Sequence, residues 1–237
     1  MVGTRTFITM TTVPERLVDP WFEQNLRHTL SIIGEGKKLL LQIPPTSAKD
    51  GTLYVVPDTI HDLESSVFEI NYVEVDEGPI TKLLSALRDK RIRDDDIIIV
   101  CDDDIVYRKD VFCLLTDSVH ANPNNVSCMC NDTLEGFKGF GCRKHMLLGL
   151  LNVEIPLSSR YVDDWIIAEF LSYTGVDTVS VAYEGDTDWS CSLDVERTDT
   201  HPEWAELIND DRESMKDSCL QDIRRALSKF LNEKGGI

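Results

Sequence analysis

The sequence predicts an α/β protein in which helices flank a mainly parallel sheet. Apolar segments of strand length alternate along the chain with segments of helical period, and this order is typical of parallel strands joined by right-handed crossovers. One segment, residues 97–101, is apolar throughout, as expected of a strand that is buried on both faces. The length of 237 residues and the hydrophobic content of 42% suit one domain, or one domain with an appendage.

The first half of the chain begins with a strand and a capped helix. Asp19 can cap that helix, because Pro20 suits a first helical position and Phe22, Leu26 and Leu30 share one face. The elements expected up to residue 90 are a strand at 6–11, the helix from residue 20, a strand at 39–43, a loop at 46–66 with one short strand at 53–56, a strand at 68–75 and a helix from residue 79.

The second half continues the alternation and ends in a helix. Its expected elements are the strand at 97–101, a helix at 109–121, a strand at 126–130, a flexible aromatic loop at 136–141, a short helix at 144–151, a helix at 163–173 closed by Gly175, a strand at 178–182 and a terminal helix at 211–231. The terminal helix has apolar residues at helical spacing, so it is expected to pack back on the sheet.

Three consecutive carboxylates, Asp102, Asp103 and Asp104, follow the apolar strand. Ligands in open α/β sheets bind outside the carboxyl ends of the strands, so these acids lie where a site is expected. A divalent cation would turn their mutual repulsion into attraction. A second acidic triplet, residues 94–96, precedes the strand and is interpreted as a solvated turn. Position along the strand, and not composition, distinguishes the two triplets.

The charge balance limits the classes of partner. With 42 acidic and 24 basic residues the net charge is −18. We therefore expect neither a nucleic-acid partner nor insertion into a membrane. A phosphate-containing ligand would be held through a shared metal ion. The chain shows neither a signal-peptide pattern nor an apolar run near membrane-spanning length, which predicts a cytoplasmic protein. Its seven cysteines include no Cys-x-x-Cys pair and are interpreted as buried thiols.

Three motifs resemble those of glycosyltransferases with the GT-A fold and a DxD-type acidic motif. They are TTVPER at 11–16, GPITKLL at 78–84 and CDDDIVY at 101–107. The resemblance spans roughly residues 5–185 and points to compact glycosyltransferase domains of large algal DNA viruses, of the chlorella-virus type. It implies a GT-A (Rossmann-like) catalytic domain over residues 1–200, with a C-terminal helical extension, residues 201–237, packed on the same domain.

The same resemblance implies a nucleotide-sugar site with a metal ion. The metal, Mn²⁺ or Mg²⁺, would be bound by Asp104 and Asp102, with His201 as a late ligand. The residues implied in donor binding are Thr11, Thr12, Arg16, Lys82, Asp102, Asp103 and Gly139. Carboxylate oxygens are also the ligands that hard divalent ions prefer. The alternatives are that Arg16 and Lys82 are ordinary surface cations, that the loop around Gly139 is a mobile turn and that His201 is solvated.

An acidic pair, Asp163 and Asp164, begins a predicted helix. In the resembled family an acid at this helix start accepts the proton of the attacking sugar hydroxyl, which makes these residues the candidate catalytic bases. The alternative is that they only complement the helix dipole. A single displacement with such a base inverts the anomeric centre. Nearby Trp165, and Trp189 further on, would either stack on a sugar or belong to the core.

The predicted function is that of a metal-dependent glycosyltransferase of the hexosyltransferase class. The donor is expected to be UDP-linked and the acceptor a hydroxyl on a glycan or glycoprotein. One alternative is a phosphoribosyltransferase-like enzyme, but its site calls for small residues that cradle a phosphate, and this chain continues with Ile105-Val106-Tyr107. The other is a non-catalytic metal- or sugar-binding module, which would bind metal without breaking down nucleotide sugars.

Overall fold

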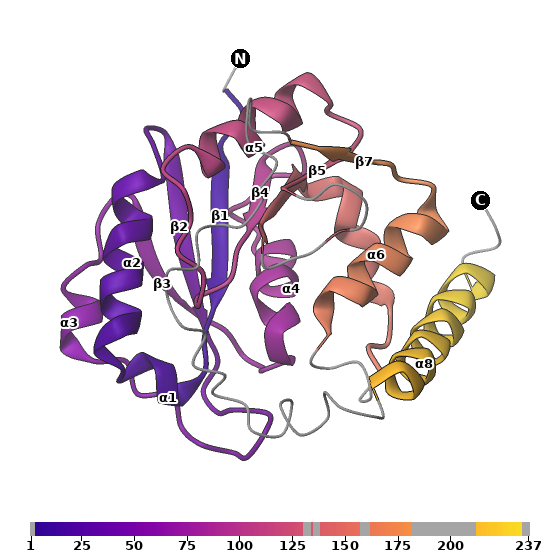
Figure 1. The fold of residues 1–237 in the computed structure, drawn as a ribbon, viewed down its shortest axis with the longest axis horizontal. Helices are drawn as coiled ribbons and strands as arrows, with labels where there is room; N and C mark the ends of the chain where they lie inside the picture. The colour runs from indigo at the N-terminus through magenta and orange to yellow at the C-terminus, as the bar shows by residue number, and fades with distance from the viewer. Residues whose placement is uncertain (1–2, 130–133, 135–137, 157–161, 182–211, 234–237) are drawn as a thin grey trace.

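The computed structural model describes residues 3–129, 134, 138–156, 162–181 and 212–233, with the side chains of the last helix described over 217–231. Within them, one seven-stranded sheet has the order β3-β2-β1-β4-β6-β5-β7 (Figure 1). The strands are β1 (Thr6–Thr11), β2 (Lys37–Ile43), β3 (Phe68–Tyr72), β4 (Ile97–Val100), β5 (Val126–Cys128), β6 (Phe140–Arg143) and β7 (Thr178–Ser180). All neighbouring strands pair in parallel except β6, which is antiparallel to both β4 and β5. A mainly parallel sheet is therefore confirmed.

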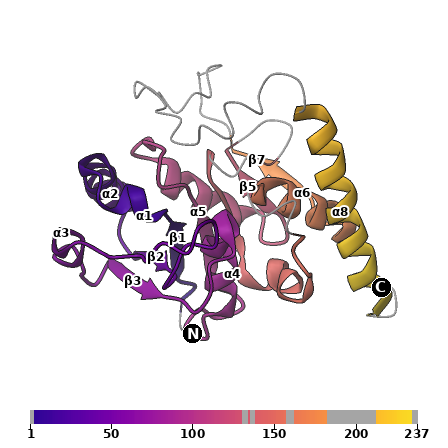
Figure 2. The same ribbon diagram turned by 90° about the horizontal axis from the view of Figure 1, so that it is seen from below.

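Helices cover both faces of this sheet (Figures 1 and 2). The α-helices are α1 (Pro14–Leu17), α2 (Pro20–Ile32), α3 (Asp58–His61), α4 (Thr81–Arg88), α5 (Val111–Ala121), α6 (Asp163–Thr174) and α8 (Arg212–Glu233). Two segments are 3₁₀-helices, η1 (Gly78–Ile80) and η3 (Lys144–Asn152). Helix α2 begins as predicted, because Asp19 accepts a hydrogen bond from the Trp21 amide and Pro20 occupies the first turn.

The alternation of side chains along β4 divides the core into two clusters. Ile97 and Ile99 pack on the face covered by α2 and α5, whereas Ile98 and Val100 pack on the face covered by α4, η3 and α6. All four side chains are fully buried. Burial on both faces explains why this strand contains no polar residue.

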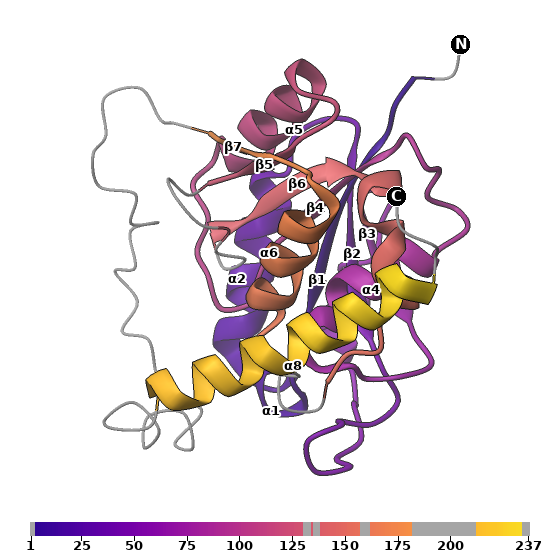
Figure 3. The same cartoon turned by 90° about the vertical axis from the view of Figure 1, so that its right-hand side faces the viewer.

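Helix α8 packs on the outside of α6 (Figures 2 and 3). Ile223 and Leu227 are buried in the same cluster as Phe170 of α6, and the Phe170 and Phe230 rings lie 6.5 Å apart. Arg224 adds an ion pair with Glu169 at 2.6 Å. The C-terminal helical extension of the predicted fold class is thus present, while the domain boundary predicted at residue 200 lies outside the described residues.

Two elements differ in kind from the sequence-based expectation. The predicted flexible loop at 136–141 overlaps strand β6, because residues 140–143 form that strand between β4 and β5. The predicted loop at 46–66 contains the one-turn helix α3, and Leu53 makes an isolated bridge with Thr46 in place of a strand. Elements of four residues contain only one or two periods of the apolar pattern, so periodicity alone does not reveal them.

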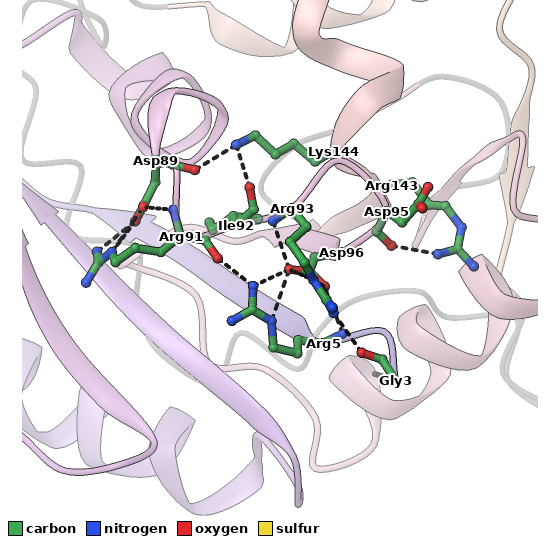
Figure 4. A network of polar contacts seen from close by, with 10 residues as sticks. All are labelled: Gly3, Arg5, Asp89, Arg91, Ile92, Arg93, Asp95, Asp96, Arg143 and Lys144. Atoms are coloured by element: carbon green, nitrogen blue, oxygen red, sulfur yellow. Dashed lines mark hydrogen bonds and ion pairs between the residues drawn. The ribbon is translucent and has the colours of Figure 1, made fainter. Parts of the chain in front are cut away.

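The acidic triplet before β4 is not a simple solvated turn (Figure 4). Asp96 is fully buried and accepts hydrogen bonds from the backbone and side chain of both Arg5 and Arg93. Burial alone would raise the pKa of Asp96, but these hydrogen bonds lower it well below its usual range. Asp94 and Asp95 are exposed. The expectation of a solvated turn is therefore wrong for one of the three acids, which joins the start of β4 to the start of β1.

Two further expectations concern cysteines and membranes. Cys101, Cys128, Cys142 and Cys219 are buried free thiols, Cys113 is partly buried, and Cys130 and Cys191 lie outside the described residues. Burial raises the pKa of the Cys142 thiol to about 12, so this thiol stays protonated and unreactive. No helix within the described ranges is long and apolar enough to cross a membrane.

Candidate functional site

A cavity of about 300 Å³ lies at the carboxyl ends of β1 and β4. Loops after β2 and β3 and the first turn of α6 complete its walls. The lining residues are Thr11, Thr12, Val13, Glu15, Arg16, Ser47, Ala48, Lys49, Tyr54, Asp76, Gly78, Pro79, Lys82, Asp102, Asp103, Asp104, Asp163 and Asp164. The structure therefore gathers in one place the three motifs of the sequence analysis and the acidic pair of α6, which are separated by up to 150 residues along the chain.

The acidic loop, residues 102–107, alternates between the cavity and the interior. The side chains of Asp102 and Asp104 are 25% and 34% exposed, whereas that of Asp103 is 7% exposed. This alternation continues the two-residue period of β4. All three acids line the cavity, but the outer two are its more exposed acids, whereas the middle acid is buried against Arg16 of α1.

Asp103 connects the end of β4 to the end of β1. Its carboxylate accepts hydrogen bonds from Thr12 Oγ1 at 2.6 Å and from Arg16 Nη1 at 2.5 Å. Burial, together with the neighbouring carboxylate of Asp104, raises the pKa of Asp103 to about 6 against the opposing effect of Arg16. Both carboxylate oxygens already have donors, so this side chain contributes to the wall of the cavity and to the position of Arg16.

Lys82 links the acidic loop to α6. Its Nζ lies 2.7 Å from Asp102 Oδ1 and 2.7 Å from Asp163 Oδ2, and the residue is only 3% exposed. Burial disfavours the charge, but Asp102 and Asp163 raise the pKa of Lys82 well above its usual range, so it stays cationic. Thr9 of β1 donates a hydrogen bond to the Lys82 carbonyl oxygen and fixes the start of α4. The lysine is therefore not an ordinary surface cation.

The two candidate bases occupy the first turn of α6. Asp163 is 7% exposed and bound to Lys82, and Asp164 is half-buried beside it. Both acids lie at a helix N-terminus, where negative charge complements the helix dipole, and both line the cavity, so the dipole interpretation and the base interpretation are compatible.

Two cavity residues were not singled out by the sequence analysis. Tyr54 donates a hydrogen bond from its hydroxyl to the Thr12 carbonyl oxygen at 3.1 Å, and burial raises its pKa, so it remains a donor. Asp76 accepts from the amides of Ala48 at 2.7 Å and Gly78 at 2.8 Å. The Asp76-Glu77-Gly78-Pro79 turn at the end of a strand was the available signal for Asp76, whereas no local pattern indicates Tyr54.

The remaining predicted site residues are Thr11, Gly139 and His201. Thr11 lines the cavity, with its hydroxyl bound to the Gln42 carbonyl oxygen at 2.9 Å. Gly139 is not among the lining residues. It precedes β6 with φ at +90°, and a Cβ there would lie 3.6 to 3.7 Å from Leu115, Tyr107 and the Val100 carbonyl oxygen, so its role is backbone conformation behind the acidic loop. His201 lies outside the described residues, as does Trp189.

The described residues fit a divalent cation shared with a ligand better than a cation bound by protein alone. Among them, no group of three or more His, Cys, Asp and Glu is arranged to hold a metal ion. Asp102 is bound through Oδ1 to Lys82, and Asp104 through Oδ2 to Arg16, which leaves one oxygen of each for a cation. Mg²⁺-type ions bind through one or two carboxylates, completed by phosphate oxygens and water. The lining contains seven carboxylates and three cations, and this excess favours a divalent ion.

Comparison with known proteins shows the fold. No protein-family model matches the sequence, and no curated protein matches it. A solved 4-diphosphocytidyl-2C-methyl-D-erythritol synthase is similar in structure, with a TM-score of 0.52 and 12% identity over 87% of this chain and 98% of that one. The chain has the GT-A fold. A cytidylyltransferase from Leptospira borgpetersenii serovar Hardjo-bovis is similar with a TM-score of 0.50 and 13% identity, over 76% of each chain. The predicted GT-A (Rossmann-like) fold class is thereby confirmed.

Proposed function

We propose that this protein is a metal-dependent glycosyltransferase that moves a sugar from a nucleoside diphosphate donor, UDP-linked, to a hydroxyl of a glycan or glycoprotein. The observation that carries the proposal is the meeting of Asp102, Asp104, Lys82 and the α6 acids in one cavity at the carboxyl ends of the strands. Support at a coarser level comes from the fold, since both similar solved structures are named as nucleotide-dependent enzymes.

The donor's diphosphate would lie between the acidic loop and two cations, the buried Lys82 and the partly buried Arg16. Arg16 and Lys82 are held in place by carboxylates, so they can attract phosphate oxygens without losing further conformational freedom. Asp102 and Asp104 would hold Mn²⁺ or Mg²⁺, which when bound stabilises the negative charge of the departing diphosphate. His201 remains a proposed third ligand from outside the described residues. The donor-binding roles of Thr11, Thr12 and Asp103 are to shape this wall.

Asp163 or Asp164 would act as the base of a single displacement. The acceptor hydroxyl loses its proton to one of these carboxylates while its oxygen bonds to the anomeric carbon, and the bond from that carbon to the diphosphate breaks. The product then has the inverted anomeric configuration. A proton spectrum of the product would show the opposite anomeric coupling from the donor, and retention would contradict the single displacement.

Nucleotidyl transfer is the second candidate, because one of the similar solved structures is named a cytidylyltransferase and another a 4-diphosphocytidyl-2C-methyl-D-erythritol synthase. Such a reaction transfers the nucleoside monophosphate group of a nucleoside triphosphate to a phosphate oxygen of the second substrate and releases pyrophosphate, so both substrates are strongly anionic. The excess of carboxylates in the cavity opposes a second phosphate. A phosphate nucleophile is also already ionised, so it needs no base at the start of α6. Both features favour a neutral hydroxyl acceptor.

One experiment separates these functions. The protein is incubated with Mn²⁺ in three separate arms, which contain a panel of nucleotide sugars, nucleoside triphosphates plus sugar phosphates, and phosphoribosyl pyrophosphate. The released phosphates are then identified. Release of nucleoside diphosphate supports glycosyl transfer, and release of pyrophosphate from triphosphates supports nucleotidyl transfer. Release of pyrophosphate from phosphoribosyl pyrophosphate would support the phosphoribosyltransferase alternative. Metal binding with no product in any arm would support the binding module.

The hexosyltransferase class, the UDP donor, the similarity to viral domains and the cytoplasmic location are parts of the same proposal. The donor panel tests the first two directly. A preference for UDP over other nucleotides, measured by competition with free nucleoside diphosphates, is the expected result.

A further inference from the structure

Helix α2 contacts the acidic loop from the side opposite the cavity. Asn25, in the second turn of α2, is 4% exposed. Its Nδ2 donates hydrogen bonds to the carbonyl oxygens of Asp103 at 2.8 Å and Ile105 at 3.1 Å. One side chain therefore holds two peptide groups of the loop that carries the candidate metal ligands.

The orientation of this amide follows from its partners. Both carbonyl oxygens can only accept, so the nitrogen of Asn25 must face them. Asn25 Oδ1 is left buried, with no hydrogen-bond partner among the described residues. A buried acceptor without a donor destabilises a fold, and an apolar residue would avoid that cost. The two hydrogen bonds to the loop account for a polar residue here.

Other contacts fix the same loop at its two ends. His28, one turn further along α2, has its Nε2 2.8 Å from the Tyr107 carbonyl oxygen. The Tyr107 hydroxyl in turn accepts a hydrogen bond from the Asp102 amide at 2.8 Å. With Asn25 at the centre, backbone groups at 102, 103, 105 and 107 all have fixed partners. This arrangement sets the direction of the Asp102 and Asp104 side chains, which leave the same stretch of backbone.

We propose that Asn25 is a positioning residue that holds the acidic loop in the shape in which Asp102 and Asp104 can share a divalent cation with a nucleoside diphosphate. The inference rests on the proposed function. Asn25 is not among the residues that line the cavity, so it acts through the loop backbone. Residues that orient metal ligands in this indirect way typically change metal affinity by about 10- to 100-fold when replaced.

The test is the affinity of the Asn25→Leu variant for Mn²⁺ and UDP. Leucine has nearly the same shape as asparagine but donates no hydrogen bond. Isothermal titration of the wild type and the variant with Mn²⁺ in the presence of UDP is expected to show a dissociation constant raised about tenfold or more, with a stoichiometry still near one. A residue that merely supported the fold would lower the stoichiometry, since fewer molecules are folded, and leave the dissociation constant unchanged. That second result overturns the proposal.

Two further variants complete the experiment. If the leucine variant does not fold, Asn25→Ala replaces it in the same comparison with the wild type. Thr29→Val is the matched control, because Thr29 lies one turn along the same helix, is fully buried, and its hydroxyl has no partner among the described residues. Its dissociation constant is expected to equal that of the wild type. If the wild type itself binds neither Mn²⁺ nor UDP, the proposed function fails and this inference fails with it. If the wild type binds them and Asn25→Leu binds them with the same dissociation constant, only this inference is overturned.

Discussion

The two acidic triplets at the ends of β4 have the same composition and different surroundings. Each contains one buried aspartate held by arginine: Asp96 by Arg5 and Arg93, and Asp103 by Arg16. They differ in the acids beside it. Asp94 and Asp95 face open solvent, whereas Asp102 and Asp104 face a cavity that also receives the acids of α6. The comparison teaches that both triplets join strands, and that only the second, which lies at the carboxyl ends of the strands, also contributes acids to a cavity.

The two buried aspartates also differ in charge environment. Asp96 has two guanidinium groups and two backbone amides around it, which lower its pKa despite burial. Asp103 has one guanidinium group and two carboxylate neighbours, and its pKa rises to about 6. Both acids connect β4 to β1, but the charge of Asp96 is compensated by its donors, whereas that of Asp103 is undercompensated beside two further carboxylates. A divalent cation would offset this excess of negative charge.

The largest expected effect comes from replacing Asp163 or Asp164, the acids of α6 that line the same cavity as the second triplet. Replacing the base by Asp163→Asn or Asp164→Asn should lower kcat by roughly 10²- to 10⁴-fold, because the acceptor hydroxyl then loses its proton without help. Donor affinity, measured by titration with Mn²⁺ and UDP, is expected to stay near the wild-type value for the residue that acts as base. If neither variant slows turnover, α6 supplies no base.

A metal-ligand variant should come next in size. Asp104→Asn is expected to weaken donor binding in the presence of Mn²⁺ by on the order of 100-fold, since the amide is a poor replacement for a charged ligand. The matched control is Asp95→Asn in the first triplet, whose side chain is exposed and which should bind the donor like the wild type. Equal affinities for both variants would mean that the two triplets do not differ in function.

The first triplet should show its effect in stability instead. Asp96→Asn is expected to lower the free energy of unfolding by roughly 2–3 kcal/mol, because it removes the partner of two guanidinium groups; both reach solvent, so the loss stays below that of a fully buried pair. Urea unfolding measures the change. Donor affinity per folded molecule should not change, and a loss of affinity would show that the two ends of β4 are coupled.

The smallest effect is in the pH dependence of stability, where the two buried acids should act in opposite directions. The pKa of Asp96 is lowered on folding, so its contribution is present above about pH 4, the unfolded pKa, and is lost as the pH falls further. The pKa of Asp103 is raised to about 6, so its contribution is present below about pH 4 and is lost as the pH rises toward 6.

Urea unfolding of the metal-free protein between pH 3 and 7 would test both slopes. Asp103→Asn should flatten the fall in stability between about pH 4 and 6, and Asp96→Asn should flatten the fall below about pH 4. If the slope of the unfolding free energy against pH is unchanged in both variants, the pH dependence of stability comes from other groups.

Much of the fold follows from local patterns in the sequence. The continuous apolar run gave β4, and Asp19 with Pro20 gave the start of α2, because strand burial and helix caps are local signals. Strand β6 was missed because Gly139 and Gly141 suggest a loop, whereas its partners β4 and β5 are set by contacts distant in sequence. Pairing of this kind has no local pattern.

The candidate site was predictable to a similar extent. Its position followed from the end of a buried strand, and the period of two separates Asp103 from its neighbours. The ion pair of Lys82 with Asp163 spans 81 positions, and the hydrogen bonds of Asn25 span 78 and 80. Contacts between such distant residues depend on how α2 and α6 pack on the sheet, which no motif encodes. The roles of the individual site residues stay predictions.

The short length of β4 has one more consequence. Its four residues, Ile97–Val100, set the alternation of side chains between the two triplets. Inserting or deleting one residue would move each side chain after that point to the opposite face of the strand. Asp102 and Asp104 would then take the buried positions of the acidic loop, and the middle acid alone would take the exposed one. Exposed loops tolerate changes of length, whereas the number of residues in β4 decides which acids of the second triplet are exposed in the cavity.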